Sequence, residues 1–182
     1  MNITVIGRGS VGGGLASLWE RRGHSVTRAG RDGGDASASD TILLAVPSNA
    51  IDEALEGVDG IVGKIVMDAT NAFTGRTGGF ESLAHQVKAR SNGLVTKAFN
   101  VNFAALYNRI EDERVRPGML YCGDEEAREV TEKLIQDAGY DPVLAGGLEN
   151  ARVLEDFLGP VMSVAQSSGG PFFYRFSQPG QL

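Results

Sequence analysis

The residues best placed to do chemistry form a glycine-rich loop near the start of the chain. Residues 7–12 read Gly-Arg-Gly-Ser-Val-Gly, the spacing G-x-G-x-x-G, with a strand-like apolar run before them and a helical pattern after them. In such a loop the first glycine makes a tight turn, the second lets a phosphate approach the backbone, and the third lets helix and strand pack closely. A pyrophosphate then binds the free N–H groups at the helix N-terminus. The loop therefore predicts a dinucleotide site, the alternative being a glycine-rich turn without a ligand.

One arginine ends the second predicted strand and another follows it, at the place where a Rossmann site distinguishes NAD from NADP. An NAD site usually carries Asp or Glu about 20 residues beyond the loop, to hold the ribose 2′-hydroxyl. This chain has Arg28 and Arg31 there, and Arg8 in the loop could add a third cation. Guanidinium groups bind a 2′-phosphate, which a carboxylate would repel. The pattern favours NADP over NAD, with Asp32 as a cap of the following turn. The alternative for each arginine is a solvated surface charge.

Groups for acid–base or metal chemistry follow no recognisable pattern. His24 begins a predicted strand and His85 lies in a predicted helix, and we interpret both as structural or solvated. Asp68 and Lys97 could each belong to a salt bridge. No Ser-His-Asp order and no metal-ligand spacing stands out in the sequence. We therefore predict no catalytic side chain and no metal site.

Alternating strands and helices must position these residues. Apolar or β-branched runs predict strands, and apolar positions at helical spacing predict helices. The predicted strands are residues 3–6, 24–28, 41–46, 65–69 and 94–99, and the predicted helices are residues 10–22, 51–55 and 80–88. Residues 29–37 are turn-rich, and too short and polar for a helix plus another strand. The alternation predicts an α/β protein with a parallel, Rossmann-type sheet and helices on both faces.

Beyond about Phe103 the pattern is less regular. We predict strands at residues 119–122 and 140–145, helices at residues 125–138 and 151–165, and an extended aromatic tail at residues 171–176. No Pro- or Gly-rich linker separates two independent domains. We therefore expect residues 1–103 to form a nucleotide-binding domain. Residues 104–182 are expected to form a small α/β lobe that packs on the sheet and helps to form the cleft and a dimer contact.

Composition and charge exclude several classes of partner. The 182 residues carry a formal net charge of −6, and the sequence pI is about 4.9, so nucleic acid is not expected as a partner. No apolar stretch is long enough to span a bilayer, and the N-terminus lacks the pattern of a signal peptide. Cys122 is the single cysteine, and we expect a small buried side chain rather than a reactive thiol. These features fit a reducing, cytoplasmic compartment.

Four phrases along the chain resemble one known family. They are residues 42–47 (Ile-Leu-Leu-Ala-Val-Pro), residues 63–71 (Gly-Lys-Ile-Val-Met-Asp-Ala-Thr-Asn), residues 97–100 (Lys-Ala-Phe-Asn) and residues 148–155 (Leu-Glu-Asn-Ala-Arg-Val-Leu-Glu). In this order they resemble the NADPH-dependent reductases of the 8-hydroxy-5-deazaflavin coenzyme F-420, from Met1 to about Phe176. The resemblance implies a Rossmann domain with a small C-terminal lobe, two cofactors that meet in the cleft between them, and commonly a dimer.

The resemblance also assigns residues to the cofactors. The family's Ser-Arg pair for the 2′-phosphate falls on Gly30 and Arg31, so the arginine is kept and the serine is lost. Arg8 replaces the family's usual threonine in the loop. The helix and strand that normally follow Arg31 are missing, so we expect a lost edge strand and a more open adenine side. The predicted cofactor-binding residues are Gly7, Arg8, Gly9, Ser10, Val11, Gly12, Arg28, Arg31, Ala45, Val46, Pro47, Asn71, Phe99 and Asn100.

The reaction expected from this resemblance is hydride transfer between NADP(H) and a deazaflavin or flavin. Such a transfer needs no titrating side chain, because the cofactors make and break the bonds while the protein stacks the rings and excludes water. Flavin-using relatives share the nucleotide domain, so the acceptor stays open. An imine or keto-acid reductase would need a placed acid and a larger helical domain than this chain has. The alternative function is a redox sensor that binds NADP(H) without chemistry, which the short segment after Arg31 mildly favours.

Overall fold

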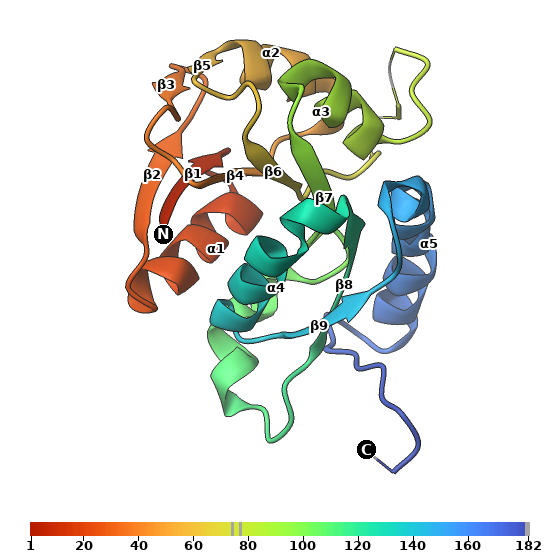
Figure 1. Ribbon diagram of the computed structural model, residues 1–182. Helices are drawn as coiled ribbons and strands as arrows, with labels where there is room; N and C mark the ends of the chain where they lie inside the picture. Colours follow the sequence, from red (N-terminus) through yellow and green to blue (C-terminus); the bar gives the residue numbers. More distant parts are fainter. Residues whose placement is uncertain (74, 77, 181–182) are drawn as a thin grey trace.

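Seven strands form one sheet through the middle of the protein (Figure 1). The computed structural model describes residues 1–73, 75–76 and 78–180. The strand order is β2-β1-β4-β6-β7-β8-β9. The strands from β2 to β7 are parallel, β8 is antiparallel to β7, and β9 is parallel to β8. Their bounds are β1 (Asn2–Ile6), β2 (Ser25–Ala29), β4 (Thr41–Leu44), β6 (Ile65–Asp68), β7 (Leu94–Ala98), β8 (Gly118–Gly123) and β9 (Asp141–Leu144).

The neighbouring strands β1 and β4 are buried along almost their whole length. Ile3, Val5 and Ile6 of β1 are at most 1% exposed, and all four residues of β4 are buried. Continuous burial on both faces is what a parallel sheet covered by helices requires. Because β1, β2, β4 and β6 are parallel, the loops that follow them meet at one edge of the sheet, which is where an open α/β sheet binds ligands.

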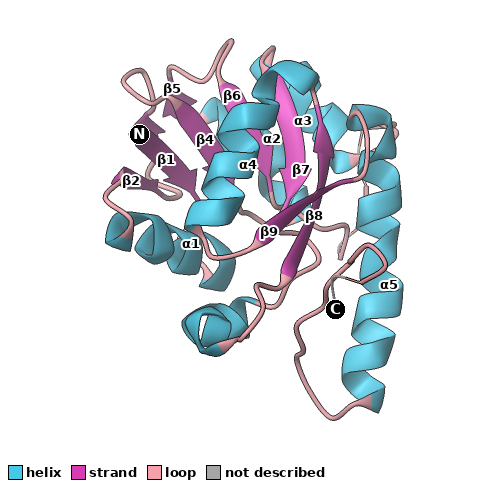
Figure 2. Cartoon of the chain, turned by 60° about the horizontal axis from the view of Figure 1, so that its bottom comes forward, coloured by secondary structure: helices cyan, strands magenta, loops and turns pink. Residues whose placement is uncertain are grey.

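Helices cover both faces of this sheet (Figure 2). The α-helices are α1 (Ser10–Arg21), α2 (Ile51–Glu56), α3 (Leu83–Ser91), α4 (Arg128–Asp137) and α5 (Ala151–Ser167), and the 3-10 helices are η1 (Ser48–Ala50), η2 (Ala104–Asp112), η3 (Glu125–Ala127) and η4 (Leu148–Asn150). The first apolar core joins α1, η2 and α4 to one face, and the second joins α2, α3 and α5 to the other. The predicted α/β, Rossmann-type fold is confirmed. None of the helices in the described part of the chain is long and apolar enough to cross a membrane.

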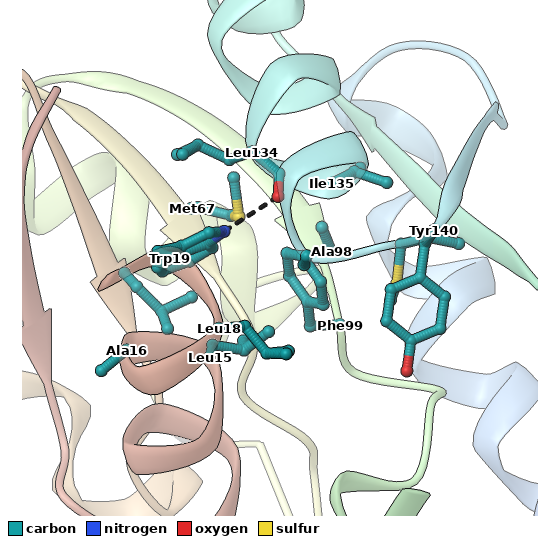
Figure 3. Packing of buried hydrophobic residues seen from close by; sticks show 14 of the residues in the cluster. Leu15, Ala16, Leu18, Trp19, Met67, Ala98, Phe99, Leu134, Ile135 and Tyr140 are labelled. Atoms are coloured by element: carbon teal, nitrogen blue, oxygen red, sulfur yellow. Dashed lines mark hydrogen bonds between the residues drawn. The ribbon is translucent and has the colours of Figure 1, made fainter. Parts of the chain in front are cut away.

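The core beneath α1 is built around aromatic side chains (Figure 3). The Trp19 ring is fully buried, and its Nε1 donates a hydrogen bond to Leu134 O of α4 at 2.9 Å. Phe99 lies edge-on to Trp19, with ring centroids 6.0 Å apart, and edge-on to Tyr140 at 6.3 Å. Removing a buried ring of this kind typically costs about 3–5 kcal/mol. This cluster therefore fixes α1, and with it the loop before α1, against the end of β7.

The segment after β2 contains the shortened part of the fold. β2 is an edge strand of the described sheet, as expected from the missing helix and strand. In their place β3 (Gly34–Asp35) pairs with β5 (Val58–Asp59) in a separate two-residue ladder, which the sequence did not predict. Gly34 N donates to Gly57 O at 3.2 Å, and Lys64 Nζ donates to Ser37 O at 2.9 Å. The chain after β2 is thus fastened to the end of α2.

The C-terminal part of the chain extends the same sheet. The predicted boundary between residues 103 and 104 falls between β7 and η2, and β7 pairs directly with β8. The division into two domains stays a prediction, since strands on both sides of the boundary share one hydrogen-bonded sheet. The 3-10 helix η2 was not predicted. Gly14 of α1 makes room for it, because a Cβ at this position would lie 2.5 Å from the ring of Tyr107.

Candidate functional site

Three glycines shape the turn between β1 and α1, each for a different reason. Gly7 has φ +110°, and a Cβ there would lie 2.2 Å from Ala45 O. A Cβ on Gly12 would lie 2.0 Å from Gly7 O, so the helix could not approach the strand. At Gly9 a Cβ would meet no protein atom within 4 Å. The first and third glycines are thus required by the protein itself, whereas the second leaves open space beside the backbone.

The N-terminus of α1 points its free backbone amides toward this open space. Gly9 is the N-cap residue, with no side-chain cap, and there is no acidic side chain in the first turn. Gly13 N donates to Gly9 O at 2.8 Å, so the amides that precede it have no partner within the helix. An uncapped helix N-terminus carries a partial positive charge and binds anions. The loop therefore has the geometry of a phosphate site.

A groove of about 910 Å³ runs from this loop across the ends of β1, β2 and β4. Seven predicted residues line it: Gly7, Arg8, Gly9, Arg31, Ala45, Val46 and Pro47. Its opposite wall was missed in the sequence and includes Asn49, Ala50, Glu53, Ala54 and Gly57. Residues 50, 53, 54 and 57 follow helical spacing and are mostly small. That spacing is a signal by which this face of α2 could have been recognised.

The end of the groove beside the turn after β2 carries charges of both signs. Gly33 N donates to Gly30 O at 3.1 Å, which closes a turn that presents Arg31 and Asp32 to the groove. Arg8 reaches across from the loop, and its Nη2 lies 3.3 Å from the Asp32 carboxylate. A Cβ at residue 30 would lie 2.9 Å from Arg8 Cζ. The guanidinium of Arg8 thus uses the space that a side chain at residue 30 would need.

Arg28 is not brought into the groove. Its Nη1 and Nη2 donate to the two carboxylate oxygens of Glu20 in α1, at 2.5 and 2.8 Å. Side chains alternate along a strand, and Arg28 shares the face of β2 on which Val26 packs against the α1 core. The hydrogen bond from Arg28 lowers the pKa of Glu20. The sequence correctly places Arg28 at the end of β2, but it does not predict the direction in which the Arg28 side chain points.

A second, smaller hollow of about 240 Å³ adjoins the groove. It shares Ala45, Val46 and Pro47 with the groove and is further lined by Val11, Ser48, Ala69, Asn71 and Phe73. Phe73 is 73% exposed at its mouth and was not predicted, because it stands in a turn-rich segment without periodicity. Asn71 Nδ2 donates to Asn100 O at 2.6 Å, which holds the Asn71 amide in one orientation. None of the described residues that line this hollow titrates near neutral pH.

The remaining predicted residues lie behind these walls or beside them. Phe99 is 1% exposed and belongs to the aromatic core, so the structure places it away from both cavities, with a left-handed backbone at φ 62°. Asn100 is 3% exposed and donates to Leu154 O at 3.0 Å, so it supports Asn71 from behind. Gly12 is buried under the loop, and Ser10 is exposed at the start of α1.

A buried ion cluster ties α5 to the segment that carries the second hollow. Lys97 Nζ lies 2.8 Å from Asp68 Oδ2 and 3.2 Å from Glu155 Oε1, and all three side chains are fully buried. Glu155 also accepts from Leu83 N and from Arg76 Nε, both at 2.8 Å. Both Asp68 and Lys97 belong to a salt bridge, in agreement with the sequence. Removing one member of such a cluster leaves an uncompensated buried charge, which typically costs about 3–5 kcal/mol.

The histidines and the cysteine have structural surroundings. His24 Nε2 lies 2.8 Å from Asp137 Oδ2, and His85 Nδ1 lies 2.7 Å from Ser82 Oγ at the N-cap of α3. Burial raises the pKa of the Cys122 thiol to about 12, so it is not a nucleophile near neutral pH. These interpretations are confirmed. Among the described residues, no cluster of three or more His, Cys, Asp or Glu is arranged to hold a metal ion.

Comparisons with known proteins find likeness in structure only. No family model matches the sequence, and a comparison with curated protein sequences gives no match. A protein from Arthrobacter sp. FB24, proposed to be an F420-dependent NADP reductase, matches with a TM-score of 0.81 and 21% identity over 97% of this chain and 99% of that one. A hypothetical protein from Sinorhizobium meliloti matches with a TM-score of 0.66 and 26% identity, over 81% and 86% of the two chains.

A third structure is a reductive aminase from Aspergillus terreus in complex with NADPH and ethyl levulinate. It matches with a TM-score of 0.68 and 16% identity over 92% of this chain, which spans 62% of the aminase. These likenesses show that the chain has a Rossmann-type α/β fold.

Proposed function

We propose that the chain is an NADP(H)-dependent oxidoreductase that transfers a hydride between the nicotinamide and a planar deazaflavin or flavin ring. The observation that carries the proposal is that two neighbouring cavities share lining residues. The groove over the N-terminus of α1 and the smaller hollow share one wall, formed by Ala45, Val46 and Pro47. Hydride transfer requires two rings held face to face, and a second hollow beside the proposed nucleotide groove supports such an arrangement.

The residues of the groove fit NADP(H). The uncapped N-terminus of α1 and the open side of Gly9 suit a pyrophosphate. Arg31 in the turn after β2, and Arg8, which reaches across from the glycine loop, supply guanidinium groups for a 2′-phosphate, without Arg28. The small side chains on the groove face of α2 leave width for the adenine. The aminase structure with NADPH bound supports the proposal by likeness of fold.

The chain's own side chains position the reacting rings and shield them from water, and they do not exchange protons with them. Val46, Pro47 and Phe73 give the second hollow apolar walls, which would shield from water the face of a ring packed against them. Asn71, fixed by Asn100, presents an amide of defined orientation to the same hollow. When bound, the nicotinamide supplies or accepts the hydride, so no protein acid or base is required. This fits a hollow without a titrating lining residue among those described.

The deazaflavin assignment rests on the sequence resemblance, and the likeness to the Arthrobacter protein supports it. The test is to mix the purified protein with NADPH and oxidised coenzyme F-420, and in parallel with FMN or FAD. We expect the absorbance of at least one of these acceptors to bleach as NADPH is consumed. Binding of NADP(H) without turnover of any acceptor would contradict the enzyme assignment, and no binding of NADP(H) at all would contradict the cofactor assignment too.

A second candidate is a redox sensor that binds NADP(H) and does no chemistry. The observation that favours it is the two-residue β3–β5 ladder, which replaces a full strand and helix beside the groove. Tight NADP(H) binding by calorimetry, together with no turnover in the acceptor test, is the result that selects this candidate.

A further inference from the structure

Arg8 and Asp32 form an ion pair directly over the backbone of Gly30, at the phosphate-recognition end of the groove. All three residues line the groove. Arg8 Nη2 lies 3.3 Å from the Asp32 carboxylate and 3.3 Å from Arg28 O. A Cβ on Gly30 would lie 2.7 Å from Asp32 Oδ1, so the pair packs closely on this turn. One of the two cations that face the groove is therefore already engaged by a carboxylate.

The turn keeps Asp32 close to Arg8. Gly33 closes it by donating to Gly30 O, with φ +80°, and a Cβ on Gly33 would lie 2.4 Å from Gly57 O. The next residues enter the β3–β5 ladder, which holds the turn against the end of α2. The carboxylate can rotate away from Arg8, but its negative charge stays at this end of the groove.

The ion pair between Arg8 and Asp32 is weak enough for a phosphate to displace Asp32 from Arg8. Charge-assisted N–H···O bonds are usually about 2.7–2.9 Å long, so 3.3 Å is a loose contact. The Arg8 and Asp32 side chains are 54% and 71% exposed. Exposed pairs of this kind typically change an equilibrium constant by about five-fold or less. A 2′-phosphate can therefore take over the Arg8 guanidinium, but it does so in competition with Asp32 and beside its charge.

We propose that Asp32 is a specificity-determining residue that lowers the selectivity of this groove for NADPH over NADH. It competes with the 2′-phosphate for Arg8 and repels it, whereas a free ribose 2′-hydroxyl can donate a hydrogen bond to the carboxylate. Arg8 and Arg31 instead raise the selectivity for NADPH, because their guanidinium groups attract the 2′-phosphate. The groove thus carries recognition groups for both cofactors, and Asp32 sets the balance. This inference rests on the proposed binding of NADP(H).

The first test compares Asp32→Asn with the wild-type chain. Dissociation constants for NADPH and NADH, which differ only in the 2′-phosphate, are measured by fluorescence titration. We expect Asp32→Asn to bind NADPH roughly 3- to 10-fold more tightly, and NADH with unchanged or lower affinity. The matched control is Asp35→Asn, three residues on, because Asp35 does not line the described groove and its contact with Ser37 N can be kept by an amide oxygen. The control should change neither constant.

The second test asks whether the effect passes through Arg8. In an Arg8→Gln background the competition for the guanidinium is gone, so Asp32→Asn should gain about two-fold or less in NADPH affinity. Equal changes for NADPH and NADH, or no change in Asp32→Asn, would overturn the inference, and an equal gain in both backgrounds would overturn the competition for Arg8. Wild-type chain that binds neither nucleotide would instead contradict the proposed function. The two failures are thus separate results of the same titrations.

Discussion

Asn71 and Asn100 each donate a side-chain hydrogen bond to the other. Asn71 Nδ2 donates to the backbone carbonyl of Asn100 at 2.6 Å, and Asn100 Nδ2 donates to Asn71 Oδ1 at 3.2 Å. Asn100 Nδ2 also donates to Leu154 O, so this pair of asparagines is attached to α5. The segments after β6 and β7 are therefore held together at the wall of the second hollow, and the orientation of the Asn71 amide is set by partners outside that hollow.

This arrangement predicts that Asn71 affects the chemical step more than nucleotide binding. We expect Asn71→Ala to lower the rate of hydride transfer by about 10-fold or more, because a fixed amide is lost beside the reacting rings. The dissociation constant for NADPH should change by about two-fold or less, since Asn71 does not line the described groove. Single-turnover kinetics and a binding titration separate the two effects. Asn108→Ala, at an exposed position of η2, is the control, and an effect on NADPH affinity alone would contradict the prediction.

Arg31 and Arg28 should behave differently although both follow the glycine loop by about 20 residues. A charge-assisted hydrogen bond is worth about 1.5–3 kcal/mol, so Arg31→Ala should weaken NADPH binding by roughly 10- to 150-fold and leave NADH nearly unchanged. Arg28→Ala should change the affinity for both by about two-fold or less, because its guanidinium is bound to Glu20. Calorimetric titrations of both variants provide the comparison. Equal losses in the two variants would show that position in sequence, not side-chain direction, decides the recognition.

Substitutions at two glycines of the loop should separate the stability of the fold from the binding of the dinucleotide. A Cβ at residue 9 meets no protein atom within 4 Å, so Gly9→Ala should unfold at nearly the wild-type temperature while losing about 10-fold or more in dinucleotide affinity. A Cβ at residue 12 would lie 2.0 Å from Gly7 O, so Gly12→Ala should be destabilised by about 3 kcal/mol or more, or fail to fold. Thermal unfolding followed by a titration of the folded variant tests both statements. Wild-type affinity in Gly9→Ala would rule out a pyrophosphate at this loop.

The fold should lose one of its helix-to-helix links in acid. Asp52 of α2 accepts hydrogen bonds from Arg90 Nε at 2.9 Å and Gln86 Nε2 at 2.8 Å, both in α3. The hydrogen bond from Arg90 is the larger cause that lowers the pKa of Asp52 below 3.8, followed by that from Gln86. A lowered pKa in the folded state means that the link stabilises the fold fully above the unfolded value and is lost as the pH falls through the folded one.

Urea denaturation of wild type and Asp52→Asn tests this link. The carboxylate is 42% exposed, so we expect the variant to be about 1 kcal/mol less stable, or less, at pH 6. The difference should shrink and vanish as the pH falls through the lowered pKa of Asp52, because the wild-type carboxyl is then protonated as well. A difference that stayed constant over this range would show that the charge of Asp52 does not carry the link.

The parts of the site that follow local rules could be predicted from the sequence. The glycine loop between a strand and a helix is a local pattern, and Gly7, Gly9 and Gly12 have the separate roles that it implies. The buried strands could be recognised because they are apolar on both faces. Lys97 and Asp68 were recognisable as partners in salt bridges, but their shared partner Glu155 lies on α5, far along the chain.

The parts that depend on tertiary contacts could not be predicted. The direction of Arg28 is decided by Glu20 on the neighbouring helix, and Phe99 is drawn into the core by Trp19 and Tyr140. The far wall of the groove depends on the pairing of β3 with β5, two strands of two residues each that have no periodicity to detect. The sequence pattern therefore does not specify the direction of such side chains or the short pairings between distant segments.

The edge position of β2 has a consequence for how molecules of this protein meet in concentrated solution. A strand that pairs on one side only offers a row of backbone donors and acceptors to any other strand, which is a route to aggregation. Here that edge is five residues long, includes the charged Arg28, and runs straight into a glycine-bounded turn. Short length, charge and an abrupt end are the features by which natural sheets avoid growing from molecule to molecule. The arginine that the groove does not use thus helps to keep the exposed edge from acting as a template.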